Sequence, residues 1–166
     1  MTRATTHLGR LKTEPKSTDP RNYPMETFRM TLKQAAPKRV LIADDDPIMR
    51  HLITTIIKQQ EYEAVVANDG REAYRILLSD SEFRAAILDM TMPFLEGLDL
   101  IRYMRSERRL IRIPIMMITA DQDLKLMASS FAAGATAFLP KPLTPEQLQG
   151  AIRMFLGNRK STRRAA

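Results

Sequence analysis

Five short apolar runs, separated by segments with helical periodicity, place the strongest constraint on the fold of this chain. The runs cover residues 40–43, 64–67, 85–88, 115–118 and 137–139. Continuous apolar runs of this length are typical of parallel strands that are buried on both faces. Parallel strands require crossover connections, and right-handed crossovers place helices on both faces of the sheet. The sequence therefore predicts an α/β fold with a doubly wound, five-stranded parallel sheet.

Signals for the start and end of helices lie between these runs. Asp46 is suited to cap a helix, because its side chain can accept a hydrogen bond from the first turn, and Pro47 fits the first helical position. Thr144 and Gln147 have the spacing of a capping box for the last helix. Gly134 is suited to the left-handed backbone that ends the helix before it. These signals agree with the alternation of strands and helices.

Composition separates the chain into one domain and two tails. Residues 38–157 hold all the periodic segments, whereas residues 1–37 carry scattered prolines and basic residues, which predicts a disordered basic arm. Residues 158–166 are predicted to be a basic tail. The absence of cysteine excludes disulfides and thiolate metal sites. With no long apolar segment and no secretory signal, we expect a cytoplasmic protein without membrane insertion.

The positive net charge of +7 is concentrated at the two ends of the chain. The first 39 residues contain nine Lys or Arg and three acids, and the last ten contain four Lys or Arg and no acid. The central part is therefore mildly acidic, although residues 105–112 form a strongly basic segment that we expect to be exposed. A basic protein is a candidate for binding nucleic acid, but here that reasoning applies only to the tails.

Polar side chains follow four of the five predicted strands. The buried run 85–88 leads directly into Asp89, and a turn follows that contains Pro93 and Gly97. The carboxyl ends of parallel strands meet at one edge of the sheet, where ligands bind in folds of this class. The side chains expected to converge there are Asp44, Asp45, Asp89, Thr119 and Lys141.

These residue types together favour phosphoryl transfer. Neighbouring carboxylates repel one another unless a cation lies among them, and Mg²⁺ is the divalent ion that prefers such oxygen ligands. Lys141 would add a positive charge, and Thr119 would add a hydroxyl donor. This set can stabilise the oxygens of a phosphoryl group while one carboxylate acts as the nucleophile.

At this point the chain resembles the receiver domain of two-component response regulators. The matching motifs lie in residues 40–46, 87–93 with Gly97, 114–120 and 134–142, and together they cover residues 38 to about 157. Each motif alone is weak, but their order and spacing are specific. The resemblance implies a stand-alone receiver of the flavodoxin-like fold, with strand order 2-1-3-4-5 and no separate output domain.

The resemblance also implies a role for each residue of the constellation. Asp89 would accept a phosphoryl group from a histidine kinase or a histidine phosphotransfer protein. Asp44, Asp45 and Asp89 would hold Mg²⁺ together with the backbone carbonyl of Thr91, with Asp45 the preferred direct ligand among the acid pair. Lys141 would pair with the phosphoryl group.

Two further residues would convert this chemistry into a signal. Thr119 would bond a phosphoryl oxygen, and Phe138 would be the aromatic switch that rotates when Thr119 moves. Phe138 can pack but cannot donate a hydrogen bond, unlike the Tyr or His that also occur at this position in the family. The expected product is a phosphorylation-dependent switch that docks to a downstream target protein. Its own phosphorylation and slow dephosphorylation would be its only catalysis, so we do not expect an enzyme.

Two alternatives remain to be weighed on the sequence. Phosphatases of the haloacid dehalogenase type also use an Asp nucleophile, but they need a second Asp where this chain has Thr91, and their acid pair comes late in the chain. The second alternative is a receiver whose basic tails bind nucleic acid or an anionic surface without sequence specificity. No helix-turn-helix follows residue 157, so reading of specific bases is not expected.

Overall fold

The computed structural model describes residues 38–120 and 123–157, and within them it contains one five-stranded sheet. All neighbouring strands are parallel, in the order β2-β1-β3-β4-β5. Both the predicted fold class and the predicted strand order are confirmed. The strands are β1 (Arg39–Ala43), β2 (Glu63–Ala67), β3 (Ala85–Leu88), β4 (Ile115–Thr119) and β5 (Ala137–Pro140).

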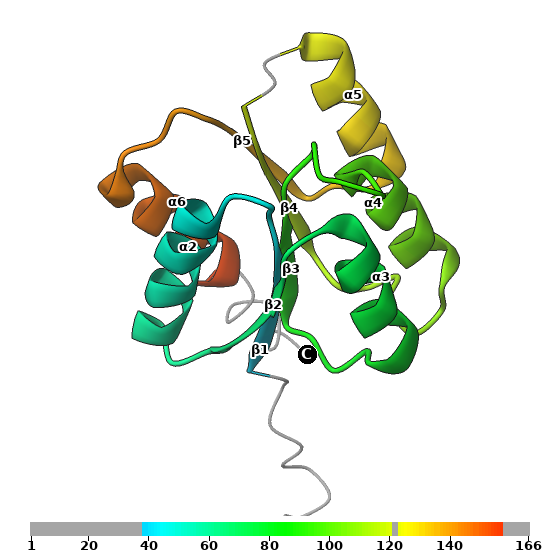
Figure 1. Cartoon of the computed structure of the whole chain (residues 1–166), viewed down its shortest axis with the longest axis horizontal. Coiled ribbons are helices and arrows are strands. Elements are labelled where there is room, and N and C mark those ends of the chain that lie inside the picture. Colours follow the sequence, from blue (N-terminus) through cyan, green and yellow to red (C-terminus); the bar gives the residue numbers. More distant parts are fainter. Residues whose placement is uncertain (1–37, 121–122, 158–166) are drawn as a thin grey trace, which may run out of the picture. The chain divides into compact units, whose positions relative to one another are not determined.

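Helices cover both faces of the sheet (Figure 1). Two of them pack on one face and three on the other, as right-handed crossovers require. The first pair is α2 (Pro47–Gln59) and α6 (Pro145–Gly157). The other face carries α3 (Gly70–Ser79), α4 (Gly97–Ser106) and α5 (Leu124–Ala133).

The core consists of two apolar layers that the sheet separates. Alternate residues of β1 contribute to each layer: Leu41 packs with α3 and α4, whereas Ile42 packs with α2 and α6. All four residues of β3 are buried, since this strand lies inside the sheet beneath helices on both faces. Burial of one large aliphatic side chain contributes about 1.5–3 kcal/mol. These layers hold the strand ends in fixed positions.

The helix caps agree with the sequence signals. Asp46 Oδ1 accepts a hydrogen bond of 2.8 Å from the Ile48 N–H at the start of α2. Thr144 and Gln147 form the reciprocal bonds of a capping box, at 3.2 and 3.0 Å. Gly134 ends α5 with φ of 112°, in the left-handed region. The local sequence therefore determines where these helices begin and end.

Two details differ from the sequence expectation. Four strands extend one residue beyond the apolar runs, because the backbone ladder continues through residues such as Glu63 and Thr119 whatever their side chains. Arg105 was expected on an exposed basic segment but is half-buried. Its guanidinium donates to the Gly134 carbonyl at 2.7 Å and to the Ile113 carbonyl at 2.9 Å, so it connects α4 to the end of α5.

The predicted arm and tail, residues 1–37 and 158–166, lie outside the described residues. None of the helices in the described ranges is long and apolar enough to cross a membrane.

Candidate functional site

Two buried aspartates lie side by side at the carboxyl edge of the sheet. Asp44 follows β1 and Asp89 follows β3, and these strands are neighbours. The Asp89 N–H donates to the Ala43 carbonyl at 2.7 Å, so the strand pairing itself fixes both carboxylates. Asp44 is 1% exposed and Asp89 is 7% exposed. Burying two acids at this spacing is unfavourable without a cation.

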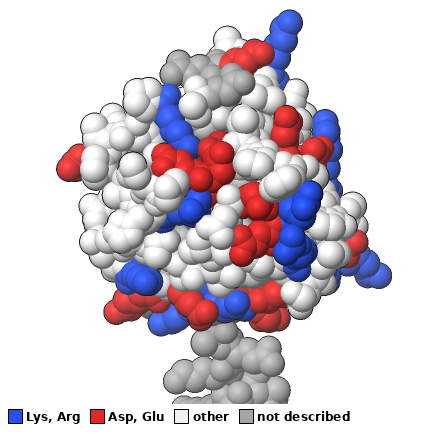
Figure 2. All heavy atoms as spheres, viewed as in Figure 1, with Lys and Arg blue, Asp and Glu red and all other residues white. Residues whose placement is uncertain are grey.

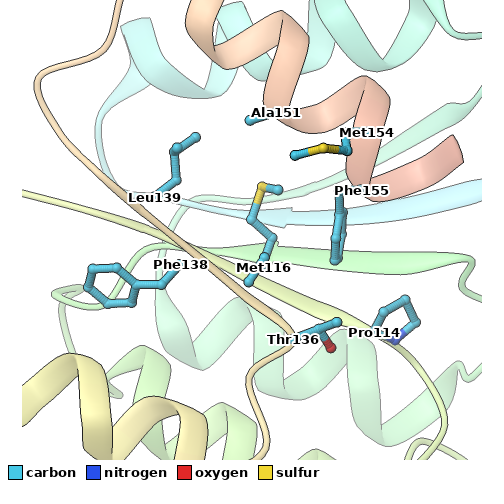
Figure 3. Close-up of a pocket in the computed structure, with 9 residues that line it drawn as sticks. Pro114, Met116, Thr136, Phe138, Leu139, Ala151, Met154 and Phe155 are labelled. Atoms are coloured by element: carbon cyan, nitrogen blue, oxygen red, sulfur yellow. The ribbon is translucent and has the colours of Figure 1, made fainter. Parts of the chain in front are cut away.

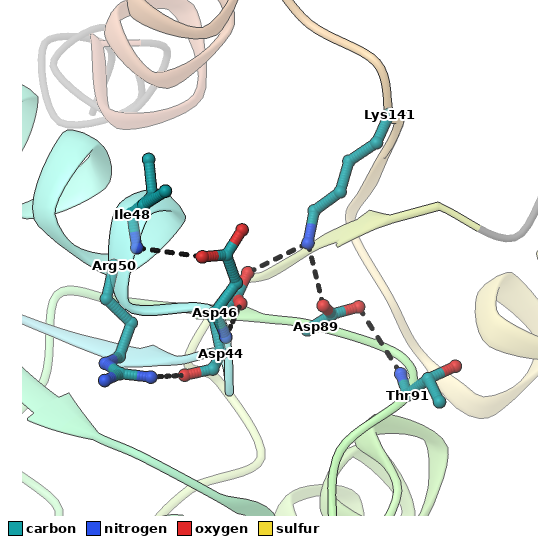
Figure 4. A network of polar contacts seen from close by, with 7 residues as sticks. All are labelled: Asp44, Asp46, Ile48, Arg50, Asp89, Thr91 and Lys141. Carbon is teal, nitrogen blue, oxygen red and sulfur yellow. Dashed lines mark hydrogen bonds and ion pairs between the residues drawn. The ribbon is translucent and has the colours of Figure 1, made fainter.

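Lys141 supplies a positive charge between them (Figure 4). Its Nζ lies 2.8 Å from Asp89 Oδ2 and 3.1 Å from Asp44 Oδ2. Lys141 follows β5, and its backbone N–H donates to the Thr119 carbonyl at 2.7 Å. The ends of four strand segments therefore meet at one point, as the sequence predicted for these residues.

Local bonds hold the Asp44 segment in place. Asp44 Oδ1 accepts from the Asp46 N–H at 2.9 Å, and the Asp44 carbonyl accepts from the Arg50 guanidinium at 2.7 Å (Figure 4). Burial raises the pKa of Asp44 above its ordinary value, and the nearby Asp89 acts in the same direction. The bond from Asp46 and the charge of Lys141 oppose the increase without cancelling it.

Lys141 remains charged in this environment. Burial acts to lower the pKa of Lys141, but the hydrogen bond and charge of Asp89, with the charge of Asp44, outweigh burial and raise the pKa. One ammonium group thus faces a cluster of carboxylates. The site retains an excess of negative charge, which a divalent cation would neutralise.

The carboxylates have the arrangement of a metal site. One oxygen from each of Asp44, Asp45 and Asp89 lies within 4.8 Å of the others, and Asp45 is exposed while the other two are buried. The Thr91 N–H lies 3.4 Å from Asp89 Oδ1, which places the start of the following loop beside the cluster. Mg²⁺ takes a few carboxylates and keeps several waters, and one exposed acid beside two buried acids fits that preference.

The two predicted switch residues lie on β4 and β5, the strands that lead to Thr119 and Lys141. Thr119 ends β4 and is 1% exposed. Phe138 in β5 packs on the α5 side, with its ring centroid 6.4 Å from that of Phe131. Its side chain points away from that of Leu139, which packs toward α6 (Figure 3).

Sequence reasoning missed two residues near the cluster. Arg50 was assigned no role, yet it donates to the Asp44 carbonyl. Phe94, in the loop after Asp89, has φ of 71° and is 68% exposed. The only signal for Phe94 in the sequence was its size, because glycine would be better suited to a turn of this kind.

Comparison with known proteins agrees with this geometry. Residues 40–153 match the response regulator receiver domain family. The chain belongs to this receiver family. It is 33% identical to the chemotaxis protein CheY1 of Helicobacter pylori over 120 residues, which are 72% of this chain and 97% of that protein.

Solved structures show the same receiver fold. The chemotaxis response regulator CheY4 of Vibrio cholerae is 29% identical, with a TM-score of 0.65 over 70% of this chain and 97% of that chain. The receiver domain of the sensor histidine kinase PA1611 of Pseudomonas aeruginosa is 24% identical, with a TM-score of 0.62 over 72% of this chain and 97% of that chain. That structure has a magnesium ion coordinated in its active-site cleft.

Membership of the receiver family establishes the general function. This receiver is a phosphorylation-dependent signalling switch of a two-component system. Mg²⁺ is its cofactor, and the Asp44, Asp45 and Asp89 cluster provides suitable oxygen ligands. Receivers interact with histidine kinases and with downstream targets.

Proposed function

We propose that Asp89 is the phospho-acceptor of this receiver. The observation that carries the proposal is the position of Lys141, whose Nζ contacts both Asp89, 52 residues earlier in the chain, and Asp44, 97 residues earlier. Asp89 is also one of the three carboxylates of the acid cluster, and its Oδ1 lies 3.4 Å from the N–H of Thr91 in the loop that follows. Among the described residues, Asp44 shares both the lysine and the acid cluster, but it is more deeply buried than Asp89 and its other oxygen already accepts from the Asp46 N–H.

The Mg²⁺ ligands would be Asp44, Asp45, Asp89 and the Thr91 carbonyl. Asp45 is the best direct ligand of the acid pair, because it is exposed, whereas Asp44 already bonds to Asp46 and Lys141. When bound, Mg²⁺ supplies positive charge for the phosphoryl oxygens. The magnesium-bound cleft of the PA1611 receiver domain supports this assignment.

The transfer itself is a displacement at phosphorus. An oxygen of the Asp89 carboxylate attacks the phosphorus of a phosphohistidine, a P–O bond forms, and the P–N bond breaks. The histidine nitrogen leaves with the bonding electron pair. Lys141 exchanges part of its contact with Asp89 for a phosphoryl oxygen, and the Thr119 hydroxyl donates to another. The donor is a histidine kinase or a histidine phosphotransfer protein.

The signal would leave through the surface formed by α5, β5 and α6. Thr119 and Lys141 connect to this surface through the pairing of β4 with β5, and Phe138 lies on it beside Phe131. An apolar groove of about 350 Å³ lies between β5 and α6, with Met154 and Phe155 along its helical side (Figure 3). A downstream protein would bind this surface when Thr119 and Phe138 have moved.

The domain limits and the tails remain part of the proposal. The receiver would occupy residues 38–157, between a basic arm and a basic tail. Acidic and basic side chains are interspersed on the face shown in Figure 2, which offers no extended basic surface for nucleic acid. No observation on residues 38–120 and 123–157 favours the alternative of binding through the tails.

The catalysis of this protein would be confined to its own phosphorylation and slow dephosphorylation.

Labelling with a small phosphoryl donor tests the acceptor. With Mg²⁺ and phosphoramidate, we expect the wild type to gain one phosphoryl group that hydroxylamine removes, as it does an acyl phosphate, and intact mass spectrometry would detect it. Asp89→Asn should gain none, because the amide is not a nucleophile for this reaction. Asp80→Asn, at the opposite edge of the sheet, is the matched control and should be labelled like the wild type. Equal labelling of Asp89→Asn would show that the acceptor is another residue.

A further inference from the structure

The loop between Asp89 and α4 contains an aromatic residue in an unfavourable conformation. Phe94 has φ of 71°, which costs a bulky residue of the order of 1–3 kcal/mol. Its side chain is 68% exposed, so burial does not offset this cost. The next residue, Leu95, is the one that packs against the core. The folding of the domain therefore gives no reason for an aromatic side chain at position 94.

This loop is held rigidly at both ends. A Cβ atom at Gly70 would lie 1.8 Å from the Leu95 carbonyl oxygen, so the loop rests directly on the start of α3. A Cβ atom at Gly97 would lie 2.2 Å from the Asp89 carbonyl oxygen. The Gly97 N–H also donates to the Met90 carbonyl at 2.8 Å. Phe94 is therefore presented to solvent from a fixed backbone, which lowers the entropy lost when a partner binds it.

Arg71 orients the ring. Its guanidinium lies 4.0 Å from the centroid of the Phe94 ring, a cation–π contact from the first turn of α3. Arg71 is itself exposed, so its remaining donors face solvent. Aromatic and arginine side chains that are already ordered are typical anchors of protein interfaces. The pair offers an apolar ring beside a positive charge.

Phe94 lies where a phosphodonor must bind. It is in the loop that Asp89 begins, and two other exposed apolar side chains, Ile48 and Leu124, lie at the starts of α2 and α5, which follow β1 and β4 at the same edge of the sheet. A specific protein interface buries about 800 Å² on each partner. A protein that brings a phosphohistidine to Asp89 will therefore cover this loop.

We propose that Phe94, oriented by Arg71, is a specificity-determining contact for the protein that phosphorylates Asp89. The inference rests on the proposed function. The partner is a phosphohistidine protein whose surface beside the histidine carries an apolar side chain next to an acidic one, matching the ring and the guanidinium. A small phosphoryl donor makes neither contact. Phe94 therefore affects transfer from a protein and leaves transfer from a small molecule unchanged.

Phe94→Asn separates these two reactions. Asparagine tolerates the left-handed region, so the variant should fold and unfold at an equal or higher urea concentration than the wild type. We expect labelling by phosphoramidate at the wild-type rate. To choose the protein donor, a panel of phosphorylated histidine kinases from the source organism is tested on the wild type. The kinase that transfers its phosphoryl group fastest is then used. With this donor, kcat/KM should fall about tenfold or more, as for loss of an interface anchor.

Three further variants sharpen the result. Leu78→Asn removes an apolar side chain that is 51% exposed at the far end of α3, and it should leave both reactions unchanged. Arg71→Gln should reduce transfer from the kinase by a smaller factor, about threefold, because the ring remains. Phe94→Tyr keeps the ring and should restore most of the rate.

The outcomes separate the two proposals. Transfer from the kinase to Phe94→Asn at the wild-type rate would overturn the role of Phe94, and so would an equal loss with both donors, which would indicate general damage to the site. If phosphoramidate labels the wild type but no kinase of the panel does, the proposal that the partner is a phosphohistidine protein is wrong. If no donor labels the wild type, the proposed function fails and this inference fails with it.

Discussion

The two ends of the central sheet both carry charged side chains, but they balance them differently. At the amino end, Arg39 pairs with Asp80 and lies 3.4 Å from Glu63, and all three side chains are partly exposed. At the carboxyl end, two buried aspartates and one exposed one share Lys141. The first cluster sets one positive charge against two negative ones in a solvated place. The second retains excess negative charge in a buried place.

The pKa shifts show the same difference. Burial acts to raise the pKa of Asp80, but the hydrogen bonds from the Glu82 backbone and from Arg39 outweigh it and lower the pKa. The pKa of Asp44 is raised, because burial outweighs its favourable contacts. Ionised Asp80 therefore stabilises the folded state, whereas ionised Asp44 opposes it. The charges at the carboxyl end therefore destabilise the fold. This arrangement is explained if the end serves to bind a cation and to react with a phosphoryl group.

Adding Mg²⁺ should produce the largest difference between the two ends. A ligand that binds only the folded state at a concentration 100 times its Kd stabilises that state by about 2.7 kcal/mol. We expect urea unfolding of the wild type to shift by this amount, and Asp80→Asn should shift equally. Asp45→Asn should lose most of the shift, because it removes a proposed ligand but leaves the fold intact. An undiminished shift in Asp45→Asn would place the ion elsewhere.

Neutralising the proposed acceptor should have the next largest effect on stability. Without Mg²⁺, we expect Asp89→Asn to raise the free energy of unfolding by about 1 kcal/mol, since one of the mutually repelling carboxylates is removed. Lys141 keeps Asp44 as its counter-charge at 3.1 Å, so no unpaired charge is created. Urea denaturation at neutral pH measures the change. A decrease in stability would mean that the pair with Lys141 outweighs the repulsion.

The sequence was sufficient to predict the convergence at the carboxyl end. A parallel sheet brings the ends of its strands together, so Asp44, Asp89 and Lys141 could be placed at one edge from their positions after apolar runs. The caps were predictable for a related reason, because Asp46 and Thr144 act within one helical turn. The family match supports the switch function, whereas the individual roles of these residues stay predictions.

Features that depend on contacts between distant segments could not be predicted. Arg105 is bonded to a carbonyl 29 residues away, and no local pattern distinguishes it from an exposed arginine. Phe94 has its positive φ directly before Leu95, whose carbonyl lies against Gly70 of a different element. Periodicity describes which side of an element is buried, but it does not describe how two loops meet.

The amino end gives the smallest expected effect, with the opposite sign to that of Asp89. At neutral pH and without Mg²⁺, Asp80→Asn should lower the free energy of unfolding by about 0.5 kcal/mol, because partly exposed ion pairs contribute amounts of this order. The folded-state pKa of Asp80 is lowered from its ordinary value of 3.8. Its contribution is therefore present above the unfolded pKa and is lost as the pH falls through the folded pKa.

The pH dependence identifies the source of that effect. Urea unfolding of the wild type and of Asp80→Asn between about pH 6 and about pH 3 should show a difference that shrinks toward the acid end, because Asp80 is increasingly protonated there and then resembles the neutral asparagine. If the difference stays constant across this range, it arises from hydrogen bonding or packing that does not depend on charge. The charge at the amino end would then not stabilise the fold, and the contrast between the two ends would rest on the carboxyl end alone.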